Sequence, residues 1–304
     1  MTFRGVIPPV VVPLTADGEL DVVSYERHVN RLIDAGVDGL FILGSSGEVV
    51  FSTDERRRQV ITETVRIVAG RTPILVGVID TTTPRVIEQA RVAQELGADA
   101  IVATAPFYAI LGPKEIKRHF RLIKQAIDLP LFAYDIPVCV HVKLSPAMII
   151  ELAREGVLQG VKDSSGDDVS FRNLALMRTE EGLDLTLLTG HEVVVDGAYM
   201  SGADGSVPGL GNVEPKVYVE QWHAAQAGDW DRVRELQDYA ARLMRITSVT
   251  TGEFGFAAGV GAFKTALMLL GVFDTNVMPE PVQALEGHNV EAVAGVLRQA
   301  GLLN

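Results

Sequence analysis

The chain has 304 residues, of which 47% are hydrophobic and 22% charged, so it can bury a large core and is not of the disordered, collagen-like or fibrous class. Its 27 Lys and Arg residues face 39 Asp and Glu residues, which gives a formal net charge of −12. This charge provides no general attraction to nucleic acid or to an anionic membrane. We therefore expect a small-molecule ligand, and neither nucleic acid nor a membrane as a partner.

A single cysteine, Cys139, can form neither an intramolecular disulfide nor a cysteine-based zinc site. The first residues show no signal-peptide pattern, and the sequence contains no apolar span of about 20 residues. These features favour a reducing, cytoplasmic location.

Short apolar runs alternate with amphipathic segments along most of the chain, which is typical of buried parallel strands covered by helices. Helical patterns fill the gaps, for example over 22–34 and 53–68. The strand-like runs are 7–12, 39–43, 74–79, 100–104, 131–134, 159–162, 185–189 and 205–207.

A weak internal repeat supports this reading. The segments AGVDGL (35–40), LGADAI (96–101) and SGADGS (201–206), and more loosely EGVLQGV (155–161), each place a glycine where a helix would end. Eight strand-then-helix units, with no GxGxxG after the first strand, predict an α/β fold of the (β/α)8 TIM barrel type rather than an open sheet.

After Val207 the strand signal stops, and only helical patterns follow, over 216–227, 230–246, 257–270 and 290–302. The sequence therefore predicts two parts. Residues 1–212 would form the catalytic barrel, and residues 213–304 a C-terminal helical extension.

In such a barrel the chemistry collects at the carboxyl ends of the strands. The second strand runs into Gly44-Ser45-Ser46-Gly47-Glu48, whose hydroxyls and backbone N–H groups suit a carboxylate, although a serine-capped loop explains it equally well. Tyr108 and Tyr134 follow the fourth and fifth strands. They can be packing residues or site residues.

Lys162 ends the otherwise apolar sixth strand. Lysine is rarely buried without a partner, and desolvation favours the neutral amine that attacks a carbonyl to form a Schiff base. The alternative is a structural lysine paired with a nearby carboxylate. The other lysines lie on helical or loop segments and are expected to be solvated; they are Lys114, Lys117, Lys124, Lys143, Lys216 and Lys264.

The seventh strand ends in Gly190-His191-Glu192 and the eighth in Val207-Pro208-Gly209. The six histidines show no HExxH or HxH spacing, so no metal site is predicted, although His141 and His191 can enter the same pocket. Cys139 is more typical of a small buried hydrophobe than of a nucleophile.

Taken together, the Gly44–Glu48 loop, the Tyr108 loop, Tyr134-Asp135-Ile136-Pro137, Gly160-Val161-Lys162-Asp163 and Gly202-Ala203-Asp204-Gly205 resemble the dihydrodipicolinate synthase and N-acetylneuraminate lyase family. Their order and separation match over nearly the whole chain. The resemblance implies a barrel with a helical extension, a homotetramer built from dimers, and a Schiff base between a lysine and pyruvate or another 2-keto acid. It implies no cofactor beyond that covalent bond.

By this resemblance Lys162 is the Schiff-base lysine and Tyr134 the phenol that moves protons and contacts the keto-acid carboxylate. Ser45, Ser46 and Gly47 would bind the carboxylate, and Tyr108 would complete a proton relay across a subunit interface. The backbone carbonyl at Val207 would lie near the reactive centre. Ser164 and Gly190 are further expected substrate contacts.

Two departures from the family pattern concern the substrate. Lysine-biosynthetic synthases carry an arginine where this chain has Cys139, and sialic acid lyases carry two adjacent acids where it has Glu192 and Val193. Cys139 and Glu192 are therefore expected to line the substrate site. No role is assigned to Asp135, His141 or His191.

The predicted function is that of a metal-independent Schiff-base lyase. It would be an aldolase or dehydratase acting on pyruvate or a 2-keto-3-deoxy sugar acid through Lys162. Two alternatives stay open at this point. One is an authentic dihydrodipicolinate (4-hydroxy-tetrahydrodipicolinate) synthase, and the other a catalytically silent keto-acid-binding member of the family.

Overall fold

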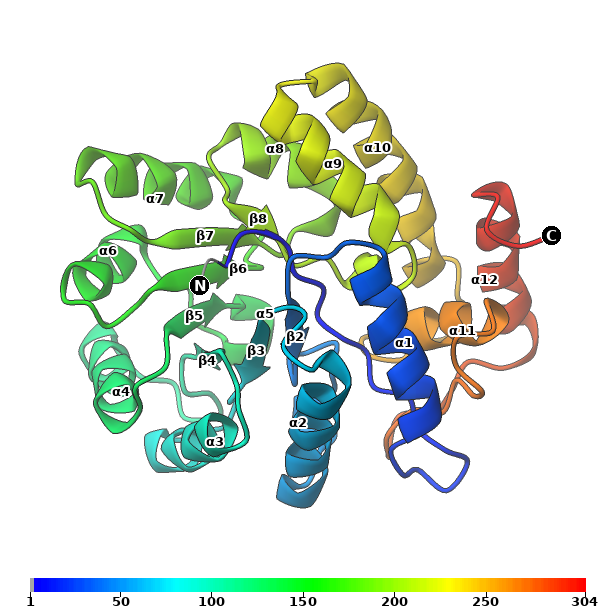
Figure 1. The fold of residues 1–304 in the computed structure, drawn as a ribbon, viewed down its shortest axis with the longest axis horizontal. Coiled ribbons are helices and arrows are strands. Elements are labelled where there is room, and N and C mark those ends of the chain that lie inside the picture. The colour runs from blue at the N-terminus through cyan, green and yellow to red at the C-terminus, as the bar shows by residue number, and fades with distance from the viewer. Residues whose placement is uncertain (1–2) are drawn as a thin grey trace.

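The computed structural model describes residues 3–304 as a ring of parallel strands with helices around it (Figure 1). Hydrogen bonds join the strands in the order β1-β8-β7-β6-β5-β4-β3-β2. The strands are β1 (Gly5–Val6), β2 (Leu40–Ile42), β3 (Ile74–Gly77), β4 (Ala100–Thr104), β5 (Leu131–Asp135), β6 (Gly160–Asp163), β7 (Thr186–Thr189) and β8 (Gly205–Ser206).

The segment that follows β1 closes the ring against β2. The backbone N–H of Phe41 donates to the carbonyl of Pro8, and the N–H of Val10 donates to the carbonyl of Phe41. This confirms the predicted (β/α)8 barrel. The apolar run 7–12, however, is not a regular strand. Pro8 and Pro9 have no backbone N–H to donate, so β1 ends at Val6 and single hydrogen bonds continue the pairing.

Helices follow the strands around the ring and, apart from the short α5, cover its outer side (Figure 1). Within residues 3–304, none of them is long and apolar enough to cross a membrane. In chain order they are α1 (Val22–Asp34), α2 (Asp54–Val68), α3 (Thr83–Glu95), α4 (Pro113–Ala126), the short α5 (Pro137–Val140), α6 (Pro146–Arg154), α7 (Asp168–Glu180), α8 (Val195–Met200) and α9 (Pro215–Ala227).

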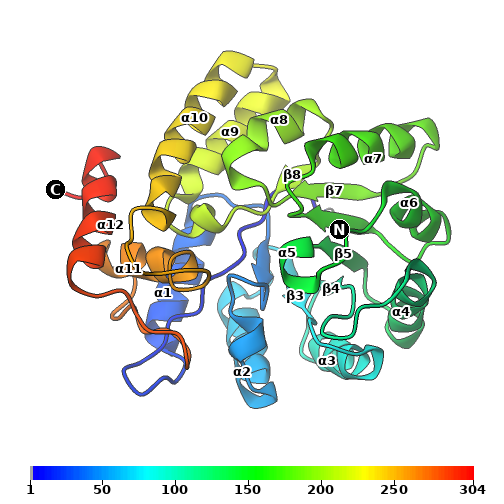
Figure 2. The same ribbon diagram turned by 180° about the vertical axis from the view of Figure 1, so that it is seen from behind.

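Three further helices, α10 (Trp230–Leu243), α11 (Val260–Leu269) and α12 (Gly287–Gln299), gather on one side of the ring (Figures 1 and 2). The segment after α11 is fixed to α1, because Arg27 donates to the Val272 carbonyl over 2.8 Å and the His28 ring stands edge-on to Phe273. Together with α9, these helices match the four C-terminal helical patterns within a few residues at each end. The division at residue 212 stays a prediction.

The repeated glycines end helices as predicted. Gly36, Gly97, Gly156 and Gly202 have φ values of +88°, +98°, +71° and +98°, a region that costs other residues about 1 kcal/mol or more. Each turn then leads into an even-numbered strand.

The same repeat also ties strands together at their amino-terminal ends. Ahead of each even-numbered strand, a side-chain oxygen accepts the backbone N–H at or near the start of the preceding strand. The four pairs are Asp38 with Val6, Asp99 with Ile74, Gln159 with Leu131, and Asp204 with Leu187. The repeat therefore builds the end of the barrel opposite the predicted site.

Candidate active site

Lys162 lies on β6 with its side chain buried at 5% exposure. Strand register places it between Tyr134 of β5 and Leu188 of β7. The Lys162 Nζ is 4.1 Å from the centre of the Tyr134 ring and 4.9 Å from that of Phe41. Aromatic faces therefore border the amine.

Tyr134 connects the lysine to the serine loop. Its ring stands edge-on to Phe41, with centroids 6.1 Å apart, and its hydroxyl lies 3.4 Å from the Ser45 Oγ. The phenol is buried at 3% exposure. A weak acid beside an amine and a hydroxyl can move a proton between them. The structure thus brings together three predicted site residues that lie far apart in the sequence.

The loop Gly44–Gly47 takes a tight course above β2. Leu43 before it and Glu48 after it both have left-handed backbones, with φ of +54° and +55°. A Cβ at Gly44 would lie 2.6 Å from the Phe41 ring, and one at Gly47 would lie 3.0 Å from the Leu43 backbone nitrogen. A side chain at Gly44 would therefore displace the Phe41 ring, and one at Gly47 would press on the Leu43 backbone. Ser45 and Ser46 are half-buried in this loop.

Gly190, at the end of β7, leaves room for the lysine. A Cβ there would lie 2.0 Å from the Ser164 Oγ and 3.1 Å from the Lys162 Cε. Ser164 and the lysine stem therefore occupy the space that a side chain at Gly190 would take. Val207, just after β8, is also buried, and its N–H donates to the Thr189 carbonyl of β7 over 2.7 Å. These three predicted contacts thus lie near the lysine or on the adjoining strands.

Glu192 is turned onto the backbone of the loop after β8. Its Oε2 accepts the Leu210 N–H over 2.6 Å, so part of its hydrogen-bonding capacity is used within the protein. Burial raises the pKa of this carboxyl from 4.5 to about 7, against the opposing effects of the Leu210 hydrogen bond and of Lys162. Glu192 therefore changes charge near neutral pH close to the amine.

This raised pKa predicts a pH-dependent stability. A carboxyl that binds its proton more tightly when folded stabilises the fold at low pH, and that stabilisation is lost as pH rises from about 4.5 to 7. Replacing Glu192 by glutamine removes the effect. We expect the melting temperature of Glu192→Gln, relative to the parent, to be higher at pH 8 than at pH 5. We expect this difference to correspond to about 2 kcal/mol. It is smaller than the full pKa shift would give, because water screens the partly exposed Glu192 carboxylate.

Thermal melting at the two pH values checks this, with Glu95→Gln at an exposed position as the control. The prediction would be wrong if the melting temperatures of the parent and of Glu192→Gln differed by the same amount at both pH values.

Asp135 is fully buried behind Tyr134 and forms an ion pair with Lys143, which also lies 3.4 Å from Asp163. Burial raises the pKa of Asp135 from 3.8 to about 6, although Lys143 opposes this. Lys143 therefore lies between two strand-end carboxylates. The expectation that it belongs to a solvated face is wrong.

Other predicted residues lie at the rim. Tyr108 has φ +71° and is 94% exposed, so it extends away from the chain's own pocket; its role across a subunit interface stays a prediction. Cys139 on α5 and His141 are also exposed, and His191 lies 3.5 Å from Asp168. Within residues 3–304, no group of three His, Cys, Asp or Glu side chains is arranged to hold a metal ion.

A cavity of about 230 Å³ opens beside Ser45. Ser45 thus has this cavity on one side. On its other side lies Tyr134, with Lys162 beyond it. The cavity is lined by Ser45, Val49, Val50, Ile79, Thr104, Phe107, Ile136, Cys139, Val140 and Phe256.

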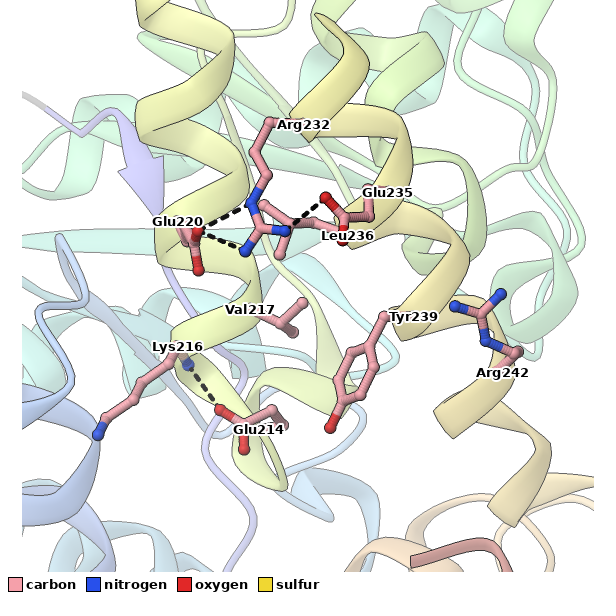
Figure 3. A pocket seen from close by; sticks show the side chains of 9 residues that line it. All are labelled: Glu214, Lys216, Val217, Glu220, Arg232, Glu235, Leu236, Tyr239 and Arg242. Carbon is pink, nitrogen blue, oxygen red and sulfur yellow. Dashed lines mark hydrogen bonds and ion pairs between the residues drawn. The ribbon is translucent and has the colours of Figure 1, made fainter. Parts of the chain in front are cut away.

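A second cavity, of about 340 Å³, lies between α9 and α10 (Figure 3). Three of its charged side chains are paired with one another, because the Arg232 guanidinium binds both Glu220 and Glu235 at 2.6 Å. Lys162 and the strand ends contribute nothing to its lining. The candidate site is therefore the Lys162 end of the barrel.

Sequence reasoning missed a buried ion pair beneath the serine loop. The Nζ of Lys264, on α11, lies 2.8 Å from the Glu48 Oε2 and also donates to the Val277 carbonyl. Lys264 is fully buried and Glu48 is 3% exposed, so the expected solvated Lys264 is wrong. Its position among apolar neighbours in VGAFKTALML was the available signal.

The protein is a closed (β/α)8 barrel with a buried amine at a strand end, a phenol beside it and a serine loop above, an arrangement typical of barrel enzymes. Comparison with known proteins agrees. Residues 2–300 match the Dihydrodipicolinate synthetase family. The chain belongs to this family, whose members are lyases.

The curated relatives match over nearly the full length. An uncharacterised DapA-like lyase of Halobacterium salinarum is 33% identical over 99% of this chain and 95% of its own. The 4-hydroxy-tetrahydrodipicolinate synthase of Phenylobacterium zucineum is 30% identical, covering 99% and 98%. The putative 2-dehydro-3-deoxy-D-gluconate aldolase YagE of Escherichia coli is 31% identical, again over 99% and 98%.

Solved structures agree with the fold. YagE of Escherichia coli in complex with pyruvate has a TM-score of 0.93 at 28% identity, covering 99% of this chain and all of its own. Dihydrodipicolinate synthase of Bacteroides thetaiotaomicron has a TM-score of 0.91 at 32% identity, covering 98% and 100%.

Proposed function

We propose that this protein is a metal-independent lyase that forms a Schiff base between Lys162 and pyruvate, or a closely related 2-keto acid, and makes or breaks the bond to C3. The observation that carries the proposal is the buried Lys162 amine, 4.1 Å from the Tyr134 ring. The Tyr134 hydroxyl in turn lies 3.4 Å from the Ser45 Oγ.

Each group suits one step of this chemistry. The neutral amine attacks the ketone carbon, and loss of water leaves an iminium that draws electrons from C3. The Tyr134 phenol accepts and returns the protons that these steps release and need. Ser45, Ser46 and the backbone of the tight loop hold the carboxylate, so that the ketone faces Lys162.

YagE, a relative crystallised with pyruvate, supports a pyruvate-sized keto acid as the first substrate. A synthase of lysine biosynthesis is the second candidate, because several full-length relatives carry that name. Cys139 speaks against it: a thiol cannot form the two charged hydrogen bonds by which an arginine binds a carboxylate. A silent keto-acid binder would keep the loop but has no need of the buried amine.

Trapping with borohydride tests the proposal. The protein is incubated with pyruvate and sodium borohydride, which reduces an iminium to a stable secondary amine, and is then digested for peptide mass spectrometry. We expect one pyruvate-derived adduct per chain, on Lys162. Binding of pyruvate by calorimetry without any adduct would identify a silent binder, and an adduct on another lysine would contradict the assignment.

A further inference from the structure

Two buried carboxylates lie side by side at the ends of β5 and β6, directly after the phenol and the amine of the site. Tyr134 of β5 pairs with Lys162 of β6. The next pair along the two strands is Asp135 with Asp163. Because successive side chains of a strand point to opposite faces, the two carboxylates lie on the face away from Tyr134 and Lys162. Both are shielded from water, at 0% and 5% exposure.

Lys143 supplies the charge that balances these carboxylates. Its Nζ forms an ion pair with Asp135 and lies 3.4 Å from the Asp163 Oδ2. No other Lys, Arg or His side chain of residues 3–304 forms an ion pair with either carboxylate. Like charges on neighbouring strands repel each other, and burial strengthens the repulsion. Burial raises the pKa of Asp135, Lys143 lowers it, and the Asp163 charge adds to the rise.

The same carboxylates also hold the backbone that follows each strand. The Asp135 Oδ1 accepts the Leu144 N–H over 3.1 Å, which fixes the segment after α5. The Asp163 Oδ1 accepts the Ser165 N–H over 2.8 Å, which fixes the loop that contains Ser164. Neither carboxylate can turn away from the other without leaving a backbone N–H unpaired. The repulsion between them therefore acts on the strand ends themselves.

The ammonium of Lys143 is fully engaged inside the protein. Lys143 lies four residues after Cys139, where lysine-biosynthetic synthases carry an arginine. However, each of its three N–H bonds has a partner, namely Asp135, Asp163 and the Leu144 carbonyl at 3.3 Å. No donor is left for a substrate carboxylate. Lys143 therefore does not replace the arginine, and its charge acts within the barrel wall.

We propose that Lys143 is a positioning residue for the Schiff-base reaction. It neutralises the two carboxylates, and by holding the ends of β5 and β6 together it keeps Tyr134 at the distance from Lys162 that proton transfer needs. A proton moves only between groups within hydrogen-bond reach, and a displacement of about 1 Å can lower a rate about a hundredfold. The inference rests on the proposed function, because it concerns the phenol and the amine of that reaction.

Exchange of the methyl protons of pyruvate in D2O tests this role without an aldehyde. The iminium on Lys162 loses a C3 proton to give an enamine, and a deuteron from the solvent then adds at C3, so the methyl signal in the NMR spectrum decays. We expect Lys143→Met to lower kcat for exchange at least about tenfold, with KM for pyruvate within about threefold of the parent. The serine loop, which holds the carboxylate, extends from β2, and β2 is not a neighbour of β5 or β6.

Two measurements show that the loss is not one of folded protein. Circular dichroism gives the folded fraction at the assay temperature. Borohydride trapping at long incubation counts the chains that still form the adduct on Lys162, and we expect one adduct per chain in Lys143→Met as in the parent. Lys216→Met, at an exposed position on α9, is the matched control.

Two further variants separate charge from packing. Lys143→Arg keeps the cation, and we expect its exchange rate to lie within about threefold of the parent. Lys143→Met/Asp135→Asn removes one carboxylate together with the cation, and the amide oxygen can still accept the Leu144 N–H. Because the repulsion is then absent, we expect this double variant to exchange at least about fivefold faster than Lys143→Met.

Each outcome decides one proposal. The positioning role is overturned, and the Schiff-base function left standing, if Lys143→Met exchanges like the parent, if it raises KM alone, or if the parent forms the adduct without exchange. A double variant that is unfolded, or as slow as Lys143→Met, also overturns the role, whereas a folded and active double variant supports it even where Lys143→Met fails to fold. Absence of both exchange and adduct in the folded parent overturns the Schiff-base function, and the positioning role with it.

Discussion

Lys162→Ala is expected to lower aldol turnover at least about a thousandfold, because no other group in the site can supply the covalent electron sink. Pyruvate trapping should disappear altogether. Lys162→Arg should be equally inactive, since a guanidinium stays protonated and cannot attack a ketone. The folded state should survive, because the side chain is bordered by rings that can close over a methyl group.

Steady-state kinetics and trapping on the same preparations check this, with circular dichroism as the test of folding. Lys216→Ala, on an exposed part of α9, is the matched control. A Lys162→Ala protein that keeps the parent's turnover would show that the reaction does not pass through this amine.

Lys264→Met is expected to have the largest effect on stability, about 3–5 kcal/mol, because it leaves the buried Glu48 carboxylate without its partner. Burial already raises the pKa of Glu48, and its Oε1 has no hydrogen-bond partner within residues 3–304. Without Lys264, the Glu48 carboxylate must either take up a proton or move, with its loop, into contact with water. Since Glu48 directly follows Ser45–Gly47, we also expect a higher KM for pyruvate.

A double-mutant cycle separates the pair from a general loss of packing. The variant Glu48→Gln/Lys264→Met removes both charges, so its melting temperature should exceed that of Lys264→Met alone. Lys216→Met serves as the exposed control. If Lys264→Met has the same melting temperature and the same KM for pyruvate as the parent, the ion pair does not support the loop.

Much of the fold could be predicted because each unit carries its own local signals. Buried parallel strands leave short apolar runs, and helix ends leave glycines such as Gly97 and Gly202, whose positive φ values the structure confirms. The helix 22–34 was predicted to the residue. The predicted first strand, 7–12, starts just after the observed β1 (Gly5–Val6), because an apolar run does not reveal that Pro8 and Pro9 lack the N–H groups a regular strand needs.

The lysine, the phenol and the serine loop could also be placed together, because every parallel strand of a barrel ends at the same face. Contacts between distant segments could not. Glu48 and Lys264 are 216 residues apart, and no local pattern relates them. The apolar cavity is likewise assembled from β2–α2, β3, β4, α5 and the loop before α11, so its character appears only once the chain is folded.

The ion pair between Glu48 and Lys264 can form only late in the synthesis of the chain. Ribosomes add about 5–20 residues per second, so the 216 residues between the two partners take roughly 10–40 s to make. During that interval the Gly44–Glu48 loop has been made, but Glu48 still lacks its partner base. The nascent barrel therefore lacks this ion pair until α11 emerges and docks. The fold around the loop is complete only when nearly all of the chain has been translated.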